Sequence, residues 1–152
     1  MTVPSHTTTA GVHDVATAAN ALRARGLRLS SARRVLLQAL FTADGPVPAE
    51  ALAAGLDGRL PPSDLTSVYR NLETLEQLGL VRHRHLGHGA GLYEPSGVPA
   101  RDLVVCERCG RWEALAPAQL DPARAAILEA TGFHPRFTHQ PLAALCGDCA
   151  DE

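Results

Sequence analysis

The chain has 152 residues, of which 45% are hydrophobic and 20% are charged, and its formal net charge is −2. This length and hydrophobic content suffice for one mid-sized domain or two small ones, so they exclude a chain that is disordered throughout. The sequence contains no run of about 18 hydrophobic residues and no secretory signal pattern at its N-terminus, so we expect a cytoplasmic protein.

The charges are distributed unevenly along the chain. Residues 1–95 carry nine Arg against eight acidic residues, whereas residues 96–152 carry five Arg against eight acidic residues. Twelve consecutive residues contain five arginines and no acid: Arg23, Arg25, Arg28, Arg33 and Arg34. A basic patch of this kind can bind phosphate although the whole chain is acidic. A solvated helix surface explains the run equally well until the fold is considered.

The first part of the chain predicts a disordered arm followed by three helices. Residues 1–13 are polar and lack periodicity, which is typical of a disordered arm. Asp14 is expected to cap a helix over about residues 15–25, and Ser30 or Ser31 is expected to cap a second helix that ends near residue 43. A short third helix is expected over Ala49–Leu56, before a run of glycine and proline residues.

A fourth helix, capped by Ser63 or Asp64, and a hairpin follow. The helix has an apolar stripe with spacings of three and four, made of Leu65, Val68, Leu72, Leu75 and Leu78. Its opposite face carries Thr66, Ser67, Tyr69, Arg70, Asn71 and Thr74. After Gly79, Leu80–Leu86 is expected to form a strand, and a glycine-rich turn leads to a second strand at residues 92–94.

Three or four helices followed by a hairpin are typical of a winged helix. In this arrangement the last helix enters the major groove of DNA and the hairpin, or wing, contacts the backbone. Tyr69, Arg70 and Asn71 offer aromatic, cationic and amide groups to base edges or phosphates. Arginines of the first two helices could bind the flanking phosphates. We therefore predict the following DNA-contacting residues: Arg28, Arg33, Arg34, Ser67, Tyr69, Arg70 and Asn71.

The last part of the chain predicts a small α/β domain. The expected elements are strands at 102–105 and 112–115, a helix at 121–131 that Asp121-Pro122 opens, and an extended segment at 133–145. The apolar content of this part is low for an independent core. We therefore expect it to depend on a bound metal and on a partner subunit.

The four cysteines form two C-x-x-C pairs, Cys106/Cys109 and Cys146/Cys149. In a reducing cytosol such pairs indicate metal ligands rather than disulfides. Zinc takes four tetrahedral ligands, and two such turns would close a site without an open position, which makes it structural. A redox disulfide and an iron–sulfur cluster are the less favoured alternatives.

Three features of the sequence resemble the ferric uptake regulator (Fur) family of bacterial metal-responsive repressors. Leu65–Val81 (LTSVYRNLETLEQLGLV) resembles the recognition helix of that family, and Gly26–Arg34 (GLRLSSARR) resembles the start of its second helix. The two C-x-x-C pairs resemble its structural zinc site. The resemblance covers about residues 15–150. It implies a homodimer that binds an inverted-repeat DNA operator through two winged helices, with the C-terminal domains paired.

The resemblance is incomplete where the family binds a second, regulatory metal. Family members typically carry a His-rich run before the first C-x-x-C pair, but this chain has Val98–Cys106 (VPARDLVVC), which keeps only Asp102. The position near Pro46, where many relatives have a histidine, holds no metal ligand. Glu94 stands where the family often has a carboxylate or cysteine ligand.

Candidate replacements lie on the hairpin. His83 and His85 alternate on one strand, so their side chains lie on one face about 7 Å apart. Imidazole suits zinc, nickel, iron or manganese. Adding the turn histidine, the hairpin and hinge carboxylates and two positions that the resemblance implies, we predict a regulatory site drawn from His83, His85, His88, Glu94, Asp102, Asp121 and His139. Equally, His83 and His85 could be wing residues that contact DNA phosphates.

These observations predict an α+β metal-responsive transcriptional repressor. The expected organisation is an arm (1–13), a winged-helix DNA-binding domain (14–95), a hinge (96–100) and a zinc-containing dimerisation domain (101–152). Zinc is the first candidate for the sensed metal because nitrogen ligands outnumber oxygen ligands, ahead of iron, manganese and nickel. A peroxide sensor is less favoured.

The main alternative is a zinc-ribbon adaptor that binds protein instead of DNA, which a covered Tyr69-Arg70-Asn71 face would favour. An enzyme is not expected, because the cysteine site is closed and no nucleophile–base pair or phosphate-binding loop is evident.

Overall fold

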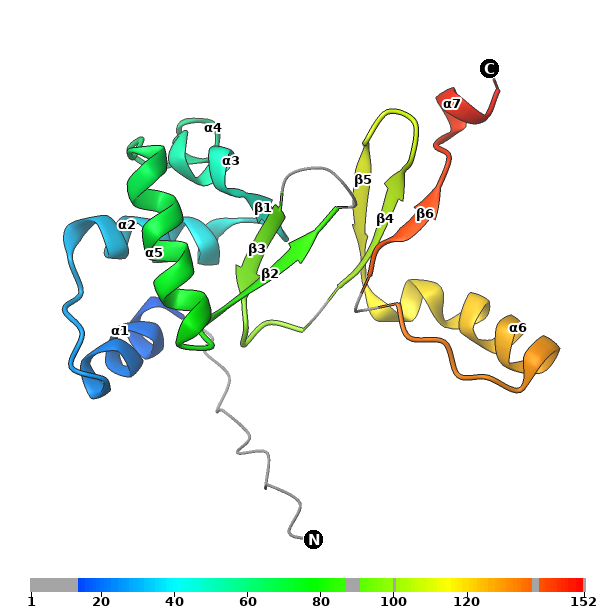
Figure 1. Ribbon diagram of the computed structural model, residues 1–152, viewed down its shortest axis with the longest axis horizontal. Helices are drawn as coiled ribbons and strands as arrows, with labels where there is room; N and C mark the ends of the chain where they lie inside the picture. The colour runs from blue at the N-terminus through cyan, green and yellow to red at the C-terminus, as the bar shows by residue number, and fades with distance from the viewer. Residues whose placement is uncertain (1–13, 87–90, 100, 138–139, 152) are drawn as a thin grey trace, which may run out of the picture.

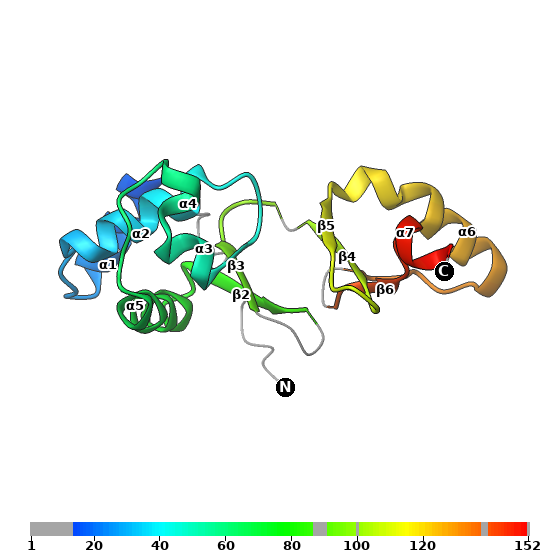
Figure 2. The same cartoon turned by 90° about the horizontal axis from the view of Figure 1, so that it is seen from above.

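The computed structural model describes residues 14–86, 91–99, 101–137 and 140–151. Its elements form two lobes, each built on a three-stranded sheet, with a short connector between them (Figure 1). Figure 2 shows the same two lobes from above. The α+β fold class expected from the sequence, a winged helix followed by a small α/β unit, is confirmed. The arm expected over residues 1–13 lies outside the described ranges. Within the described ranges, no helix is long and apolar enough to cross a membrane.

Two capped helices, α1 (Val15–Ala24) and α2 (Ser31–Thr42), begin the N-terminal lobe. The Asp14 carboxylate accepts a hydrogen bond from a first-turn backbone N–H at 2.7 Å, and the Ser30 hydroxyl accepts one at 3.2 Å. Each cap satisfies a donor that the first turn leaves unpaired. Both helices and their caps match the sequence-based expectation.

The third expected helix is interrupted by a left-handed turn. α3 (Ala49–Ala53) ends three residues earlier than predicted, and α4 (Gly55–Gly58) contains Leu56 at a φ of 53°. Gly55 has a φ of 83°, and a Cβ there would lie 2.1 Å from the carbonyl oxygen of Leu60. Only glycine fits this close approach, which lets the chain fold back while Leu56 enters the core.

The longest helix of the lobe, α5 (Leu65–Gln77), is capped by the Asp64 carboxylate, which accepts the Ser67 N–H at 2.8 Å. Its apolar stripe packs into the core at Val68, Leu72 and Leu75. Leu65 departs from the expectation because it lies in the first turn, where its side chain is 38% exposed. The core side of α5 is thereby fixed, and the opposite side faces solvent.

The wing strands β2 (Val81–His85) and β3 (Gly91–Pro95) pair antiparallel after α5. The glycine-rich turn expected between them lies on residues 87–90, outside the described ranges. A third strand, β1 (Val47–Pro48), pairs with the other edge of β3 and gives the order β1-β3-β2. Sequence reasoning missed β1 because it is two residues long and contains Pro48, a residue type that is uncommon in strands.

The C-terminal lobe contains a sheet in the order β5-β4-β6. Its strands are β4 (Asp102–Cys106), β5 (Trp112–Leu115) and β6 (Leu142–Ala144). β4 and β5 are antiparallel, whereas β4 and β6 are parallel because the chain crosses over before β6. The strand β6 lies within the segment that was expected to be extended.

A short 3-10 helix, η1 (Pro117–Leu120), leads into α6 (Asp121–Thr131), whose bounds match the prediction. α7 (Gly147–Ala150), one turn long, was not predicted. No residue of α6 is buried, and Ile127 and Leu128 are among the exposed large hydrophobic residues. Within the described part of this lobe, the buried hydrophobic residues are Leu103 and Cys106, so the lobe has almost no core of its own.

Candidate metal centre and nucleic-acid interface

The four cysteines come together at one end of the C-terminal sheet. Cys106 ends β4, and the second pair follows β6, the parallel neighbour of β4. The four sulfur atoms all lie within 4.8 Å of one another, and the Sγ atoms of Cys109 and Cys146 are 3.7 Å apart. Four Zn–S bonds of about 2.3 Å place tetrahedral sulfurs about 3.8 Å apart, so the cluster fits zinc with little adjustment.

The pKa values of the cysteine thiols also favour binding of a cation by the cluster. Hydrogen bonds from the backbone N–H groups of Cys109 and Cys146 lower the pKa of the Cys106 thiol to about 6. A hydrogen bond with the Cys146 sulfur raises the pKa of the Cys149 thiol to about 12. The cluster therefore carries thiolate character near neutral pH and has protons that a metal can displace.

Two arginines flank the cysteines. Arg108 donates to the carbonyl oxygen of Cys149 at 2.5 Å, and Arg111 pairs with Asp148 at 3.0 Å. The thiolate of Cys146 and the Asp148 carboxylate raise the pKa of Arg111. These guanidinium groups would offset part of the negative charge of a four-thiolate zinc site.

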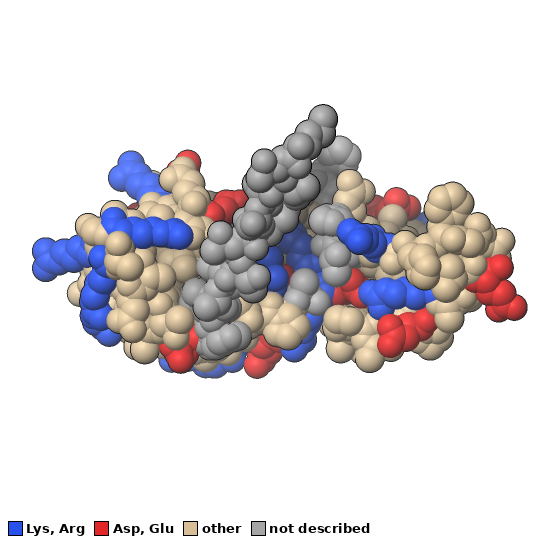
Figure 3. Space-filling model, turned by 90° about the horizontal axis from the view of Figure 1, so that it is seen from below, with Lys and Arg blue, Asp and Glu red and all other residues tan. Residues whose placement is uncertain are grey.

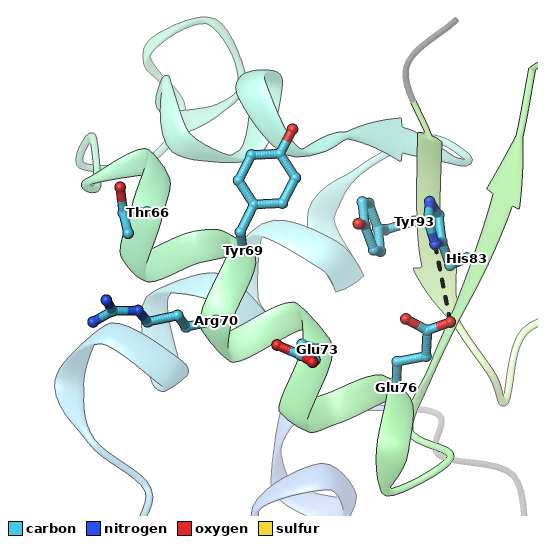
Figure 4. A pocket seen from close by; sticks show the side chains of 7 residues that line it. All are labelled: Thr66, Tyr69, Arg70, Glu73, Glu76, His83 and Tyr93. Atoms are coloured by element: carbon cyan, nitrogen blue, oxygen red, sulfur yellow. Dashed lines mark ion pairs between the residues drawn. The ribbon is translucent and has the colours of Figure 1, made fainter. Parts of the chain in front are cut away.

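The exposed face of α5 carries two of the residues predicted to contact DNA, Tyr69 and Arg70. Tyr69 is 42% exposed, and its hydroxyl donates to a carboxylate oxygen of Glu50 at 2.7 Å. Arg70, one residue further, is exposed and extends away from the wing (Figure 4). Arg28 and Arg34 are exposed as well. Figure 3 shows arginines projecting around the outer end of this lobe, whereas basic and acidic side chains alternate on the other lobe.

Arg33 and Asn71, both predicted to contact DNA, also connect two helices. The Arg33 Nε donates to Asn71 Oδ1 at 2.9 Å, and the Asn71 amide donates to the Ser67 carbonyl at 2.9 Å. Arg33 also donates to the carbonyl oxygen of Arg28 at 2.9 Å. The half-buried pair thus holds α2 against the recognition face of α5. Glu50, which sequence reasoning missed, holds Tyr69 in the same way from α3.

His83 lies between the wing and α5. Its ring stacks on Tyr93 with centroids 4.5 Å apart, and its Nδ1 is 3.9 Å from Glu76 Oε1. A Cβ at Gly91 would clash with this ring, so the glycine makes room for it. Burial, followed by the charge of His85, lowers the pKa of His83. His83 lines an open cavity of about 420 Å³ (Figure 4). The other residues that line this cavity are Thr66, Tyr69, Arg70, Glu73, Glu76 and Tyr93.

The structure does not bring the predicted regulatory ligands together. His83 and His85 share one face, with ring centroids 4.4 Å apart, but the hairpin register pairs Glu94 with Arg82 and so places it on the other face. Asp102 and Asp121 lie in the C-terminal lobe. His88 and His139 fall outside the described residues. Within the described ranges, only the cysteine cluster brings three or more His, Cys, Asp or Glu ligand atoms within 4.8 Å.

Each of the three carboxylates in that set instead has an arginine partner. Glu94 pairs with Arg84 at 2.9 Å and with Arg82 at 3.3 Å. Asp102 and Asp121 both pair with Arg124. Sequence reasoning missed these arginines, although the spacing of three residues between Asp121 and Arg124 is visible in the sequence.

The comparisons with known proteins agree with this geometry. The family described as "Ferric uptake regulator family" matches residues 24–140. The ferric uptake regulation protein of Campylobacter jejuni is 28% identical over 133 residues, which cover 86% of this chain and 85% of that protein.

Two solved structures show the same fold. The Helicobacter pylori ferric uptake regulator aligns with a TM-score of 0.66 at 15% identity and covers 93% of this chain and 97% of its own. The ferric uptake regulator of Pseudomonas aeruginosa, solved with manganese, aligns with a TM-score of 0.59 at 26% identity and covers 84% and 96%.

Proposed function

The chain belongs to the ferric uptake regulator family of metal-responsive regulators, and on this premise we propose that it is a DNA-binding transcriptional repressor. In this proposal it acts as a homodimer on an inverted-repeat operator. Residues 14–95 form the DNA-binding domain, residues 96–100 the hinge and residues 101–152 the dimerisation domain. We expect it to act on DNA in the cytoplasm.

One observation carries the DNA-binding proposal. α5 buries Val68, Leu72 and Leu75 in the core, so its opposite face, with Tyr69 and Arg70, is free to enter a major groove beside the wing. An adaptor that binds protein through this surface would be favoured if the surface were covered, but Tyr69 and Arg70 are both exposed. Arg28 and Arg34 supply further cations for the flanking phosphates.

The homodimer proposal rests on the thin core of the C-terminal lobe. α6 buries none of its residues, and Phe133, just after it, is 75% exposed. Hydrophobic residues on a lobe with so little core stabilise it only when another surface covers them. A second copy of the chain provides this cover and places two recognition helices on one side of the DNA, as an inverted repeat requires.

The cofactor we propose is a structural zinc ion held by Cys106, Cys109, Cys146 and Cys149. Four thiolate bonds would link the end of β4 to the segment that follows β6, so they would close the small sheet covalently. Zinc fits better than iron, manganese or nickel here because all four ligands are soft thiolates in two closely spaced pairs.

Selection from a random pool of double-stranded DNA, followed by fluorescence anisotropy, tests the function. We expect the selected sequences to share an inverted repeat with half-sites about one helical turn apart. Arg70→Ala should weaken binding to that repeat by about 1 to 3 kcal/mol, and binding should weaken from 50 to 200 mM salt.

Arg136→Ala is the matched control, since Arg136 is also exposed but lies in the C-terminal lobe. Its affinity should equal that of the unsubstituted protein. If Arg70→Ala bound as tightly as the control, α5 would not be the recognition helix and the proposal would fail.

A further inference from the structure

Two buried carboxylates stand at the two ends of the connector between the lobes. Glu94, the penultimate residue of β3, is 3% exposed, and Asp102, the first residue of β4, is fully buried. An ionised carboxylate at such depth is unfavourable unless a cation and hydrogen bonds compensate it. Whether that cation is an arginine side chain or a metal ion decides whether the junction can respond to metal.

At the first end of the connector, two guanidinium groups form ion pairs with Glu94. Arg84 donates to Glu94 Oε1 at 2.9 Å, and Arg82 pairs with the same oxygen at 3.3 Å. Arg82 also donates to the carbonyl oxygens of Ser96 at 3.4 Å and Val98 at 2.7 Å. One cationic side chain of the wing therefore fixes both the carboxylate and the first half of the connector.

At the second end of the connector, Arg124 of α6 forms an ion pair with Asp102. Its Nη2 donates to Asp102 Oδ2, and its Nη1 donates to Asp121 Oδ1 at 3.2 Å and to the Pro117 carbonyl at 2.6 Å. The guanidinium also lies over the Phe137 ring, 5.2 Å from its centroid. It therefore joins η1, α6, β4 and the segment after α6 around one positive charge.

These three arginines leave little room for a divalent cation at the same carboxylates. A metal at Glu94 would have to displace two guanidinium groups from a single oxygen, and a metal at Asp102 or Asp121 would meet the charge of Arg124 at close range. Asp102 Oδ1 is the one carboxylate oxygen here that is buried without a hydrogen-bond partner among the described residues. Once Arg124 is removed, both oxygens of Asp102 lack a partner, and a substitution at Arg124 is therefore the sharper test. The residues present do not fit a regulatory metal that uses these three carboxylates.

We propose that Arg82, Arg84 and Arg124 serve as built-in cations at the lobe junction, in place of an exchangeable metal at Glu94, Asp102 and Asp121. The connector is then held without metal at these residues, and DNA binding does not depend on their occupancy. This inference rests on the proposed function, because it concerns how the DNA-binding state is regulated. Any metal response of the chain must act through groups other than these carboxylates.

Metal counting tests the inference without reference to DNA. The 152-residue chain, with zinc retained, is dialysed against Co²⁺ or Mn²⁺, and bound metals are counted by mass spectrometry. We expect the unsubstituted protein to take up no Co²⁺ or Mn²⁺ ion that Asp102→Asn removes. Arg124→Ala removes the cation that pairs with Asp102 and Asp121, and it should take up an additional Co²⁺ or Mn²⁺ ion.

Two matched variants distinguish the freed site from general loosening. Arg124→Lys keeps the positive charge and should bind no additional metal. The double variant Arg124→Ala/Asp102→Asn lacks the buried carboxylate and should lose the uptake gained by Arg124→Ala. Retained zinc and an unchanged circular dichroism spectrum show that each variant is folded. If Arg124→Ala proves unfolded, the count on the unsubstituted protein and on Arg124→Lys still decides the matter.

DNA binding supplies the second readout. With zinc retained, the effect of adding Co²⁺ or Mn²⁺ on the affinity for the selected operator should agree within twofold between the unsubstituted protein and Asp102→Asn. Uptake of a second metal that also raises this affinity tenfold or more, and that Asp102→Asn abolishes, would overturn the inference. A protein that selects no DNA under any condition would refute the proposed function, whereas the metal counts would still decide whether arginines replace the metal.

Discussion

The two lobes of this chain are stabilised in different ways. The N-terminal lobe has a continuous hydrophobic core that includes Leu22, Leu37, Leu72 and Leu75, all of them essentially inaccessible to solvent. Within its described residues the C-terminal lobe buries only Leu103 and Cys106 among the hydrophobic residues. Its sheet is instead surrounded by the cysteine cluster, the Arg124 ion pairs and a helix with no buried side chain.

This difference fits the role proposed for each lobe. A recognition helix must hold its orientation in the free protein, and burial of one face in a core provides that rigidity. A dimerisation lobe can leave its hydrophobic residues exposed until a partner covers them, provided that other bonds preserve its local geometry. We therefore expect the N-terminal lobe to respond to core substitutions, and the C-terminal lobe to respond to loss of metal or of its partner.

The largest expected effect is the removal of the proposed zinc. Cys149→Ser, or a strong chelator, should unfold the C-terminal lobe, because structural zinc contributes about 10 kcal/mol or more to small domains. Limited proteolysis should then cut beyond residue 100 while the N-terminal lobe persists. Sedimentation should show a monomer.

The N-terminal lobe is the internal control for this experiment, since its core contains none of the cysteines. A dimer that remains intact after complete loss of zinc would contradict the contrast between the lobes.

The second effect concerns the N-terminal core. Leu72→Ala removes a side chain that is fully buried between α5 and its neighbours, and it should lower the free energy of unfolding of this lobe by about 2 to 5 kcal/mol. Leu65→Ala, on the exposed first turn of the same helix, should cost less than about 1 kcal/mol. Urea unfolding followed by circular dichroism measures both values, and the zinc content should stay the same. Equal losses for the two variants would show that α5 is not anchored as the structure places it.

The third effect concerns the partner subunit. The double variant Ile127→Asp/Leu128→Asp places charges on the exposed hydrophobic residues of α6 and should weaken dimerisation by about 2 kcal/mol or more. Glu129→Ala, on the same exposed helix, should leave the dimer intact. Sedimentation equilibrium measures the dissociation constants. A dimer that tolerates both aspartates would show that another surface forms the interface.

Local sequence signals predicted the elements of both lobes well, because caps and apolar spacing act within one helix or strand. Asp14, Ser30 and Asp64 cap their helices as such residues should, and the bounds of α6 were predicted fully. β1 was missed because it gains its identity only from its pairing with β3. The turn at Gly55 was missed because the approach of a residue further along the chain forces it.

The metal-ligand set shows where sequence reasoning reaches its limit. The cysteine cluster could be predicted because spacing within each pair largely determines its geometry. The grouping of Glu94 with His83 and His85 depended on the hairpin register, and the register places Glu94 beside Arg82 on the opposite face. The pairing of Asp102 with Arg124 spans 22 residues and depends on where α6 lies relative to β4, which no local pattern encodes.

The smallest expected effect is a pH dependence confined to the N-terminal lobe. Burial lowers the pKa of His83 below its ordinary value of 6.5, so the unfolded chain binds a proton more readily than the folded chain does. Acidification from pH 7 to pH 5 should therefore lower the stability of this lobe, with the loss beginning as the pH falls through the ordinary histidine value. The effect should be smaller than that of Leu72→Ala, because Glu76 lies 3.9 Å from His83 and partly compensates the imidazolium charge.

Three variants test the assignment of this pH dependence to His83. His83→Gln should flatten the dependence of stability on pH, and Glu76→Gln should steepen it by removing the compensating carboxylate. His85→Gln is the matched control: His85 is exposed on the same strand, and its loss should relieve the neighbouring charge without abolishing the pH dependence. Urea unfolding of the N-terminal lobe at a series of pH values measures these slopes. An unchanged slope in His83→Gln would show that another group is responsible.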